Sequence, residues 1–310
     1  MSRRLPPLLA TCVAATACWL APAIARAGKY DLDLTRLGSL DGSGNLVQDN
    51  EGFRSLSSEL GTLMAPRPVD PADSLGLSGF AISADVGINT IGGGRDYWAR
   101  TTRGGADNVV PTLQLMGRKG LWPGIEVGAG ATHLFDSRMW AISGYGKISL
   151  HESFRKLWIP AIALRVQGSR ILGAKDINMS TVAPSVSASY QIGLGKTFAL
   201  APYVGYEALF IISRSTVLAA NPNCDQFPDD YNDDSCPNTG QSDEFVFQNA
   251  GAIVRHRPYF GMRMQFAVIR LVFEAMFAPA GKRQGELDGA KIADRSKTQQ
   301  QYTISVGLDF

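Results

Sequence analysis

Apolar and polar residues alternate with a period of two along most of this chain. The pattern is plainest at the C-terminus, where Tyr302, Ile304, Val306, Leu308 and Phe310 are separated by small or polar residues. Because successive side chains of a β-strand point to opposite faces, the pattern predicts strands with one apolar and one polar face. Ten such strands are predicted, at 80–89, 109–115, 125–132, 140–150, 158–167, 182–191, 200–212, 258–266, 271–277 and 302–310. Eight or twelve strands remain alternatives, since Phe245 to Ile253 is apolar enough to form a further strand or to extend the eighth.

Residues 1–27 have the features of an export signal. Arg3 and Arg4 precede an uncharged apolar run, and Ala25-Arg26-Ala27 matches a cleavage site before Gly28. A transmembrane anchor is the alternative, which the early prolines and the cleavage triplet disfavour. No later segment approaches the roughly 18 uninterrupted apolar residues of a spanning helix. A membrane location therefore requires a closed barrel, in which all backbone hydrogen bonds are made between strands.

Overall charge gives no reason to expect nucleic acid as a partner. The formal net charge of the whole chain is +2, and removal of the signal with its arginines leaves the remainder close to neutral.

An alternating strand that ends the chain on Phe310, behind an export signal, resembles the closing strand of Gram-negative outer-membrane β-barrels. The resemblance implies an outer-membrane location, contact with outer-membrane lipid and recognition of residues 302–310 by the barrel assembly machinery. A narrower resemblance is to uncharacterised outer-membrane proteins of myxobacteria and relatives. It is carried by Phe53-Arg54-Ser55-Leu56, Glu59-Leu60-Gly61, Pro71-Ala72-Asp73, Gly79-Phe80, Gly117-Arg118-Lys119-Gly120-Leu121 and Pro202-Tyr203-Val204-Gly205. That family implies the barrel fold and brings no activity, so no catalytic residue and no cofactor is assigned.

The predicted connections alternate in length, as those of an outer-membrane barrel do. If both termini are periplasmic, the long connections at 92–107, 214–254 and 281–298 face outside, and the short ones at 118–121, 151–157, 193–196 and 268–270 face the periplasm. Aromatic residues lie near both predicted rims and would form two interfacial girdles. They are Trp122, Trp158, Tyr190, Phe198 and Phe310 at the inner rim, and Trp98, Phe135, Trp140, Phe210 and Tyr259 at the outer rim.

Residues 28–76 precede the barrel, which is predicted at 77–310, and are expected to be a periplasmic segment. Phe53, Leu56 and Leu60 recur at helical spacing, with Asn50 as a candidate cap and Pro66 as the stop. We expect this short amphipathic helix either to plug the barrel from below or to lie on its inner rim.

Charged residues of both signs occur at inward positions of the predicted strands. They are Asp85, Glu126, Lys147, Arg165, Glu207, Arg263 and Glu274. One interpretation is a salt-bridged core that fills the lumen, because buried charges are usually paired. The other is a narrow polar pore whose selectivity these residues set.

The longest connection carries Cys224 and Cys236, which we predict to form a disulfide in the oxidising periplasm. Asp225, Asp229, Asp230, Asp233 and Asp234 lie around them. Clustered carboxylates could bind Ca²⁺, but the spacing does not match an EF-hand loop. A solvated acidic loop is the preferred interpretation, and no metal site is assigned.

Catalysis at the outer rim would require a histidine beside paired acids. His133 and His256 lie toward that rim, but no G-x-S-x-G motif is present. The sequence therefore favours a protein that is not an enzyme, with a rim hydrolase as the least favoured alternative.

Two functions remain for the barrel. The first is a narrow porin-like channel or small-solute transporter. The second is a closed structural or surface-interaction barrel that displays the disulfide-stapled acidic loop. A continuous lumen past Arg165, Glu207 and Arg263 would favour the first function, whereas a packed lumen or a seated helix would favour the second.

Overall fold

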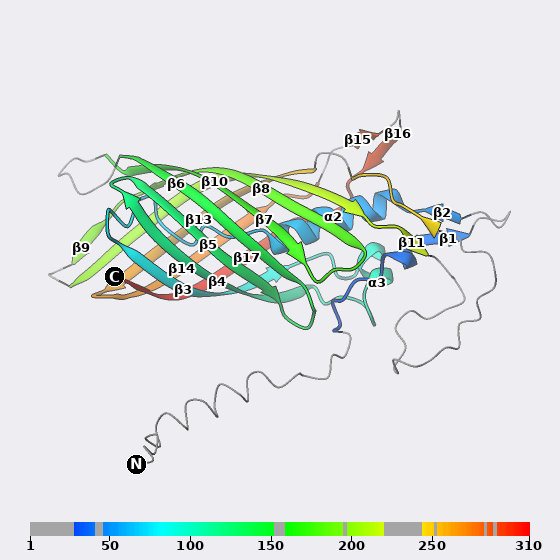
Figure 1. The fold of residues 1–310 in the computed structure, drawn as a ribbon, viewed down its shortest axis with the longest axis horizontal. Helices are drawn as coiled ribbons and strands as arrows, with labels where there is room; N and C mark the ends of the chain where they lie inside the picture. Colours follow the sequence, from blue (N-terminus) through cyan, green and yellow to red (C-terminus); the bar gives the residue numbers. More distant parts are fainter. Residues whose placement is uncertain are drawn as a thin grey trace, which may run out of the picture.

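The fold is a closed antiparallel β-barrel (Figure 1). A computed structural model describes residues 28–40, 46–151, 159–194, 197–219, 244–250, 253–281, 284–287 and 290–310. Within these ranges ten long strands form the barrel wall, as the sequence predicted. They are β3 (Phe80–Thr90), β4 (Val109–Trp122), β5 (Ile125–Leu134), β6 (Trp140–His151), β7 (Ala161–Leu172), β8 (Ile177–Ser189), β10 (Phe198–Ser215), β13 (Ile253–Phe266), β14 (Ile269–Ala278) and β17 (Gln299–Asp309).

Two pairings complete the closure of the sheet. The last strand, β17, pairs with the first wall strand, β3, with Ile304 opposite Val86. The long gap in sequence between β10 and β13 is bridged by a direct pairing that places Glu207 opposite Arg257. A short extra strand, β9 (Ile192–Leu194), adds to the end of β10. Among the described residues, three two-stranded sheets lie outside the wall: β1 (Gly38–Leu40) with β2 (Leu46–Gln48), β11 (Leu218–Ala219) with β12 (Glu244–Phe245), and β15 (Gln284–Leu287) with β16 (Ala290–Ala293).

Alternation in the wall separates an apolar outer face from a polar inner face. In β3 every second residue from Phe80 to Ile88 is exposed and the residues between them are buried. The terminal strand β17 points Tyr302, Ile304, Val306 and Leu308 outward, and Phe310 follows it with its side chain exposed. A continuous exposed apolar surface of this kind is typical of a wall that faces lipid.

Connections divide between the two ends of the barrel by length. The end that holds Phe310 and the start of β3 has the tight turns at 123–124 and 267–268. The opposite end has the long connections 91–108, 216–252 and 279–298. Three predicted turns overlap strands: 118–121 lies within β4, residues 193–194 belong to β9, and β14 already begins at Ile269. In β4 and β14 a buried arginine, Arg118 or Arg270, takes an inward position near the end of the strand and resembles a turn residue in the sequence.

Two predicted girdle aromatics have other positions. Trp98 is buried in α3 (Asp96–Thr101), within the 91–108 connection. Tyr259 points into the lumen, because it shares its face of β13 with Arg257 rather than with the outward Phe260.

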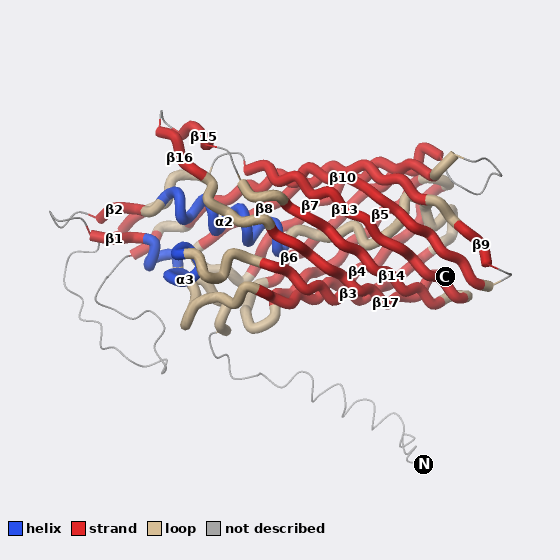
Figure 2. Tube along the Cα trace, turned by 180° about the vertical axis from the view of Figure 1, so that it is seen from behind, coloured by secondary structure: helices blue, strands red, loops and turns tan. Residues whose placement is uncertain are grey.

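The N-terminal segment lies inside the barrel and at its long-connection end. A 3-10 helix, η1 (Leu34–Leu37), and the helix α2 (Asn50–Met64) lie there, and the extended chain 65–79 then runs between the strands to the start of β3 (Figure 2). The helix is capped by the Asp49 side chain, which accepts a hydrogen bond from the Gly52 N–H at 2.7 Å. It ends before Pro66, whose ring cannot continue a helix. Among the described residues, no helix combines the length and apolar content that crossing a membrane would require.

The sequence-based expectation was a helix that plugs the barrel from below or lies on its inner rim; the helix is inside the barrel, but at the end opposite the tight turns. Residues 52–64 are all buried, and the helix contacts β5, β8, β10 and β13 near the end opposite Phe310. The reason is the extended stretch after Pro66, which runs the length of the lumen before β3 begins. Apolar helix residues such as Phe53, Leu56 and Leu60 pack with Leu209 and Ile211 of β10 in the main core cluster.

Candidate functional site

Asp70 belongs to the extended residues 65–79 inside the lumen, the central segment. Its carboxylate has five cationic side chains around it. The carboxylate lies 2.7 Å from Lys147 Nζ, 3.2 Å from an Arg118 nitrogen and 3.3 Å from an Arg270 nitrogen. Arg165 and Arg263 nitrogens are at 3.6 and 3.8 Å. These cations come from five wall strands, β4, β6, β7, β13 and β14, and all are buried. One carboxylate therefore ties the central segment to much of the barrel circumference.

Donors on the wall bond the backbone carbonyls of the central segment. Pro66 O accepts from Gln167 Nε2 and Arg257 Nη2, both at 3.0 Å, and Pro68 O accepts from Arg165 Nη1 at 2.8 Å. Further along, Val69 O accepts from Arg270, Ala72 O from Ser149 and Asp73 O from Lys147. Proline has no backbone N–H, so this stretch presents more acceptors than donors, and a wall rich in arginine suits it.

Acceptors on the wall bond the N–H groups that the segment retains. Arg67 N donates to Gln114 Oε1 at 3.1 Å, and Val69 N donates to Glu274 Oε2 at 2.9 Å. Ala72 N donates to Ser189 Oγ and Leu75 N to Glu126 Oε2, both at 3.1 Å. A buried backbone needs such partners. The segment is therefore held as a further element of the core, without forming a strand of the sheet.

The structure places all seven predicted lumen charges on the buried inner face: Asp85, Glu126, Lys147, Arg165, Glu207, Arg263 and Glu274. Most of them bond to neighbouring buried side chains. Glu126 pairs with Lys147 at 3.1 Å and accepts from the Tyr145 hydroxyl, and Glu207 pairs with Arg257. The remaining acids accept from neighbours too, Asp85 from Gln114 Nε2 at 3.0 Å and Glu274 from the Tyr203 hydroxyl at 2.9 Å.

Sequence reasoning missed several members of this network. Arg118 and Arg270 fall in predicted turns, and Arg257 lies one residue before a predicted strand. The period of two would have found them, because Arg257 has the parity of Arg263, and Arg270 has that of Glu274. Asp70 gave no such signal, since it stands in a proline-rich stretch without periodicity.

Glu59 connects α2 to the long connections. One of its carboxylate oxygens accepts from the Gly92 N–H at 2.8 Å and the Trp98 indole at 2.7 Å. The other accepts from the Tyr97 hydroxyl and the Lys297 N–H, both at 2.7 Å. Burial, together with the Glu59 charge, raises the pKa of Tyr97, so its phenol remains a hydrogen-bond donor. The helix inside the barrel therefore organises the loops above it.

The rim histidines do not face the lumen acids. His133 stacks on Trp140 with ring centroids 4.3 Å apart, and its Nδ1 lies 3.2 Å from the Met139 carbonyl oxygen. His256 is exposed on the outer face of β13 and contacts the Tyr206 hydroxyl. Cys224, Cys236 and the acidic residues between and beside them lie outside the described residues, so the disulfide stays a prediction.

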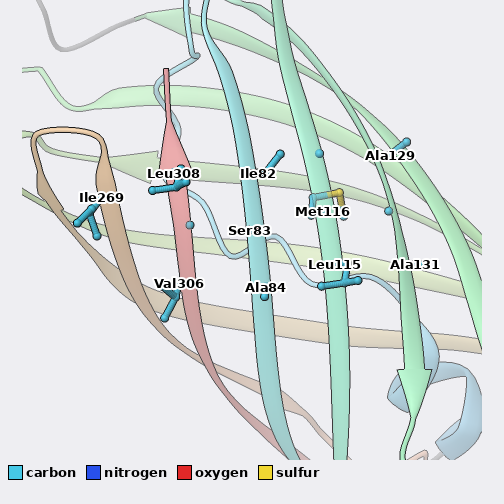
Figure 3. A pocket seen from close by; sticks show the side chains of 13 residues that line it. Ile82, Ser83, Ala84, Leu115, Met116, Ala129, Ala131, Ile269, Val306 and Leu308 are labelled. Carbon is cyan, nitrogen blue, oxygen red and sulfur yellow. The ribbon is translucent and has the colours of Figure 1, made fainter. Parts of the chain in front are cut away.

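An apolar depression lies on the outer face of the wall (Figure 3). Small residues, Ala84, Gly117, Ala129 and Ala131, line it, and Ile82, Leu115, Val306 and Leu308 stand around them. These residues belong to β3, β4, β5 and β17, and the outward side chains place the depression on the lipid side of the wall.

Matches to known proteins come from solved structures, at low sequence identity. No protein-family model matches the chain, and no curated protein matches it. Among solved structures, Ail of Yersinia pestis aligns with 75% of this chain and 99% of its own, at 10% identity and a TM-score of 0.26. The Neisserial surface protein NspA aligns with 74% and 95%, at 9% identity and a TM-score of 0.30. The outer-membrane protease OmpT of Escherichia coli aligns with 75% and 96%, at 9% identity and a TM-score of 0.25. By its own strand order, closure and apolar outer face, the chain is an outer-membrane β-barrel.

Proposed function

We propose that this outer-membrane barrel is closed and serves to present its outer end at the cell surface. The narrow channel that the sequence favoured first is the less supported function. The observation that carries the proposal is the central segment with Asp70, which contacts cations from five wall strands at 2.7 to 3.8 Å.

The free-energy cost of moving the central segment argues against an open lumen as the normal state. Moving the segment out of the lumen would separate the Asp70 carboxylate from its cations and leave buried charges without partners. Breaking a buried ion pair by removing one partner costs about 3–5 kcal/mol. Moving the segment would also release the wall donors that bond the carbonyls of Pro66 and Pro68. A solute would have to replace all of these contacts to pass.

Support for a display function comes from the outer end. The loops there are ordered on a buried helix through Glu59, in a way that a simple pore does not require. The acidic connection between β10 and β13 would be part of the surface presented. Its predicted disulfide, Cys224 with Cys236, belongs to the same proposal.

Single-channel recording in a planar bilayer tests the proposal. The refolded chain from Gly28, with heat-modifiable gel mobility as proof of folding, should give no steady current. Asp70→Arg adds a sixth cation to the cluster and should expel the segment by repulsion. The resulting current would show that the assay detects an open barrel. Asp107→Arg, at an exposed site paired with Lys29, is the matched control and should stay silent. Steady current from the unaltered chain would support the channel instead.

A further inference from the structure

The first described residues are bound to several connections at one end of the barrel. Tyr30 N donates to the Asp136 carbonyl oxygen at 3.0 Å, in the β5–β6 connection. Asp31 accepts from the Arg138 N–H at 2.7 Å in the same connection. Lys29 Nζ lies 2.7 Å from Asp107, before β4.

The chain that follows is bound at the same end. Asp33 N donates to Thr101 O in the β3–β4 connection at 2.9 Å, and Leu34 N donates to Asp176 in the β7–β8 connection at 3.1 Å. Asp49 pairs with Arg295 of the β14–β17 connection at 3.3 Å. Residues 28–49 therefore contact four separate connections, all of which lie at the long-connection end.

Phe80, the first wall residue, lies at the other end. Its N–H donates to Phe310 O at 2.9 Å, and Phe310 N donates back to Phe80 O at 2.7 Å. Residues 65–79 connect the two ends. An extended chain covers about 3.3 Å per residue, which for this stretch is ample for the roughly 25 Å apolar band of an outer-membrane barrel.

The only route between the ends that the contacts allow is the lumen. The wall strands pair continuously through the described residues, including β17 with β3 and β10 with β13, so no open edge lets a chain enter from the side. The segment contacts inward side chains throughout, from Pro66 to Leu75. Figure 1 shows α3 at the end opposite the label C, with α2 extending from that end into the barrel.

Outer-membrane barrels have short turns on the periplasmic side and long connections outside. With that orientation, we infer that residues 28–40 and 46–49 of the exported chain are located on the outer side of the membrane, and that α2 enters the lumen from that side. The barrel holds its own N-terminal segment across the lumen, with the mature N-terminus at the cell surface and the C-terminus at the periplasmic side. This inference concerns topology and does not depend on whether the lumen conducts.

Cysteine labelling on intact cells tests the topology with the full chain. In a Cys224→Ser, Cys236→Ser background, Val47→Cys, Val217→Cys and Ser78→Cys each place one thiol at an exposed residue. Val217 follows β10 at the long-connection end, and Ser78 precedes β3 at the other end. A membrane-impermeant maleimide should label Val47→Cys and Val217→Cys on intact cells, and should label Ser78→Cys only after permeabilisation.

Two labelling results would overturn the inference. In the first, Val217→Cys is labelled on intact cells, but Val47→Cys and Ser78→Cys are both labelled only after permeabilisation. The other is labelling of Ser78→Cys alone on intact cells, which would mean the opposite insertion of the whole barrel. Heat-modifiable mobility of each variant confirms that the labelled protein is folded. An epitope placed between Ala27 and Gly28 gives a second readout: antibody should bind it on intact cells, and binding only after permeabilisation contradicts the inference.

Discussion

At the scale of single residues, Asp70 is the side chain on which the lumen depends most. Five cations surround its carboxylate, and the shortest contact, to Lys147 Nζ, is 2.7 Å. Asp70→Asn keeps the shape of the side chain and removes the charge. We expect it to reduce the free energy of unfolding by about 3–5 kcal/mol, the usual cost of leaving buried charges without a partner. Urea titration of the refolded protein, followed by gel mobility, measures the change.

Asp107→Asn is the control for that substitution. It makes the same chemical change in an exposed ion pair, with Lys29 at 2.7 Å. Exposed pairs are screened by solvent and contribute little, so the urea midpoint should remain near that of the unaltered protein. Equal shifts for the two variants would mean that the cluster around Asp70 does not hold the segment in place.

At the scale of elements, α2 orders the loops above it through one carboxylate. Glu59→Gln replaces one acceptor oxygen with an NH₂ group that faces donors, and leaves two of four donors without a good acceptor. A buried donor without a partner costs about 1–3 kcal/mol. We expect trypsin to cleave the 91–108 connection roughly tenfold faster or more, since about 1.4 kcal/mol corresponds to a tenfold change in the open population. Glu51→Gln, in the same helix but half-exposed beside Arg295 at 3.4 Å, should leave the rate unchanged. Similar acceleration in both variants would assign the effect to the helix rather than to the Glu59 contacts.

The same elements show what could be read from the sequence. The wall strands could be predicted, because side-chain direction in a strand repeats every two residues and each of the ten segments shows this pattern on its own. The helix at Asn50–Met64 could also be predicted from the spacing of Phe53, Leu56 and Leu60. Its position could not, because a helix that packs inside a barrel has the same apolar stripe as one that packs beneath it. Asp70 was hidden for a related reason: its partners lie on five strands, from Arg118 to Arg270, and only closure of the barrel brings them together.

At the scale of the whole molecule, the apolar outer face of the wall stabilises the folded barrel in lipid. Val86 lies near the middle of β3, between Ile304 of β17 and Leu113 of β4, and its side chain points outward. Lipid-facing charges near the bilayer centre cost about 2–4 kcal/mol in such barrels, and much less near the interfaces. Val86→Arg should therefore lower the free energy of unfolding from phospholipid vesicles by that amount. Val217→Arg makes the same change beyond the end of β10, at an exposed residue, and should have a small effect. If the outer face contacted water, Val86→Arg would cost no more than Val217→Arg, because an arginine on a water-facing strand keeps its hydration. The difference between the two urea midpoints thus measures how deeply the middle of the wall lies in lipid.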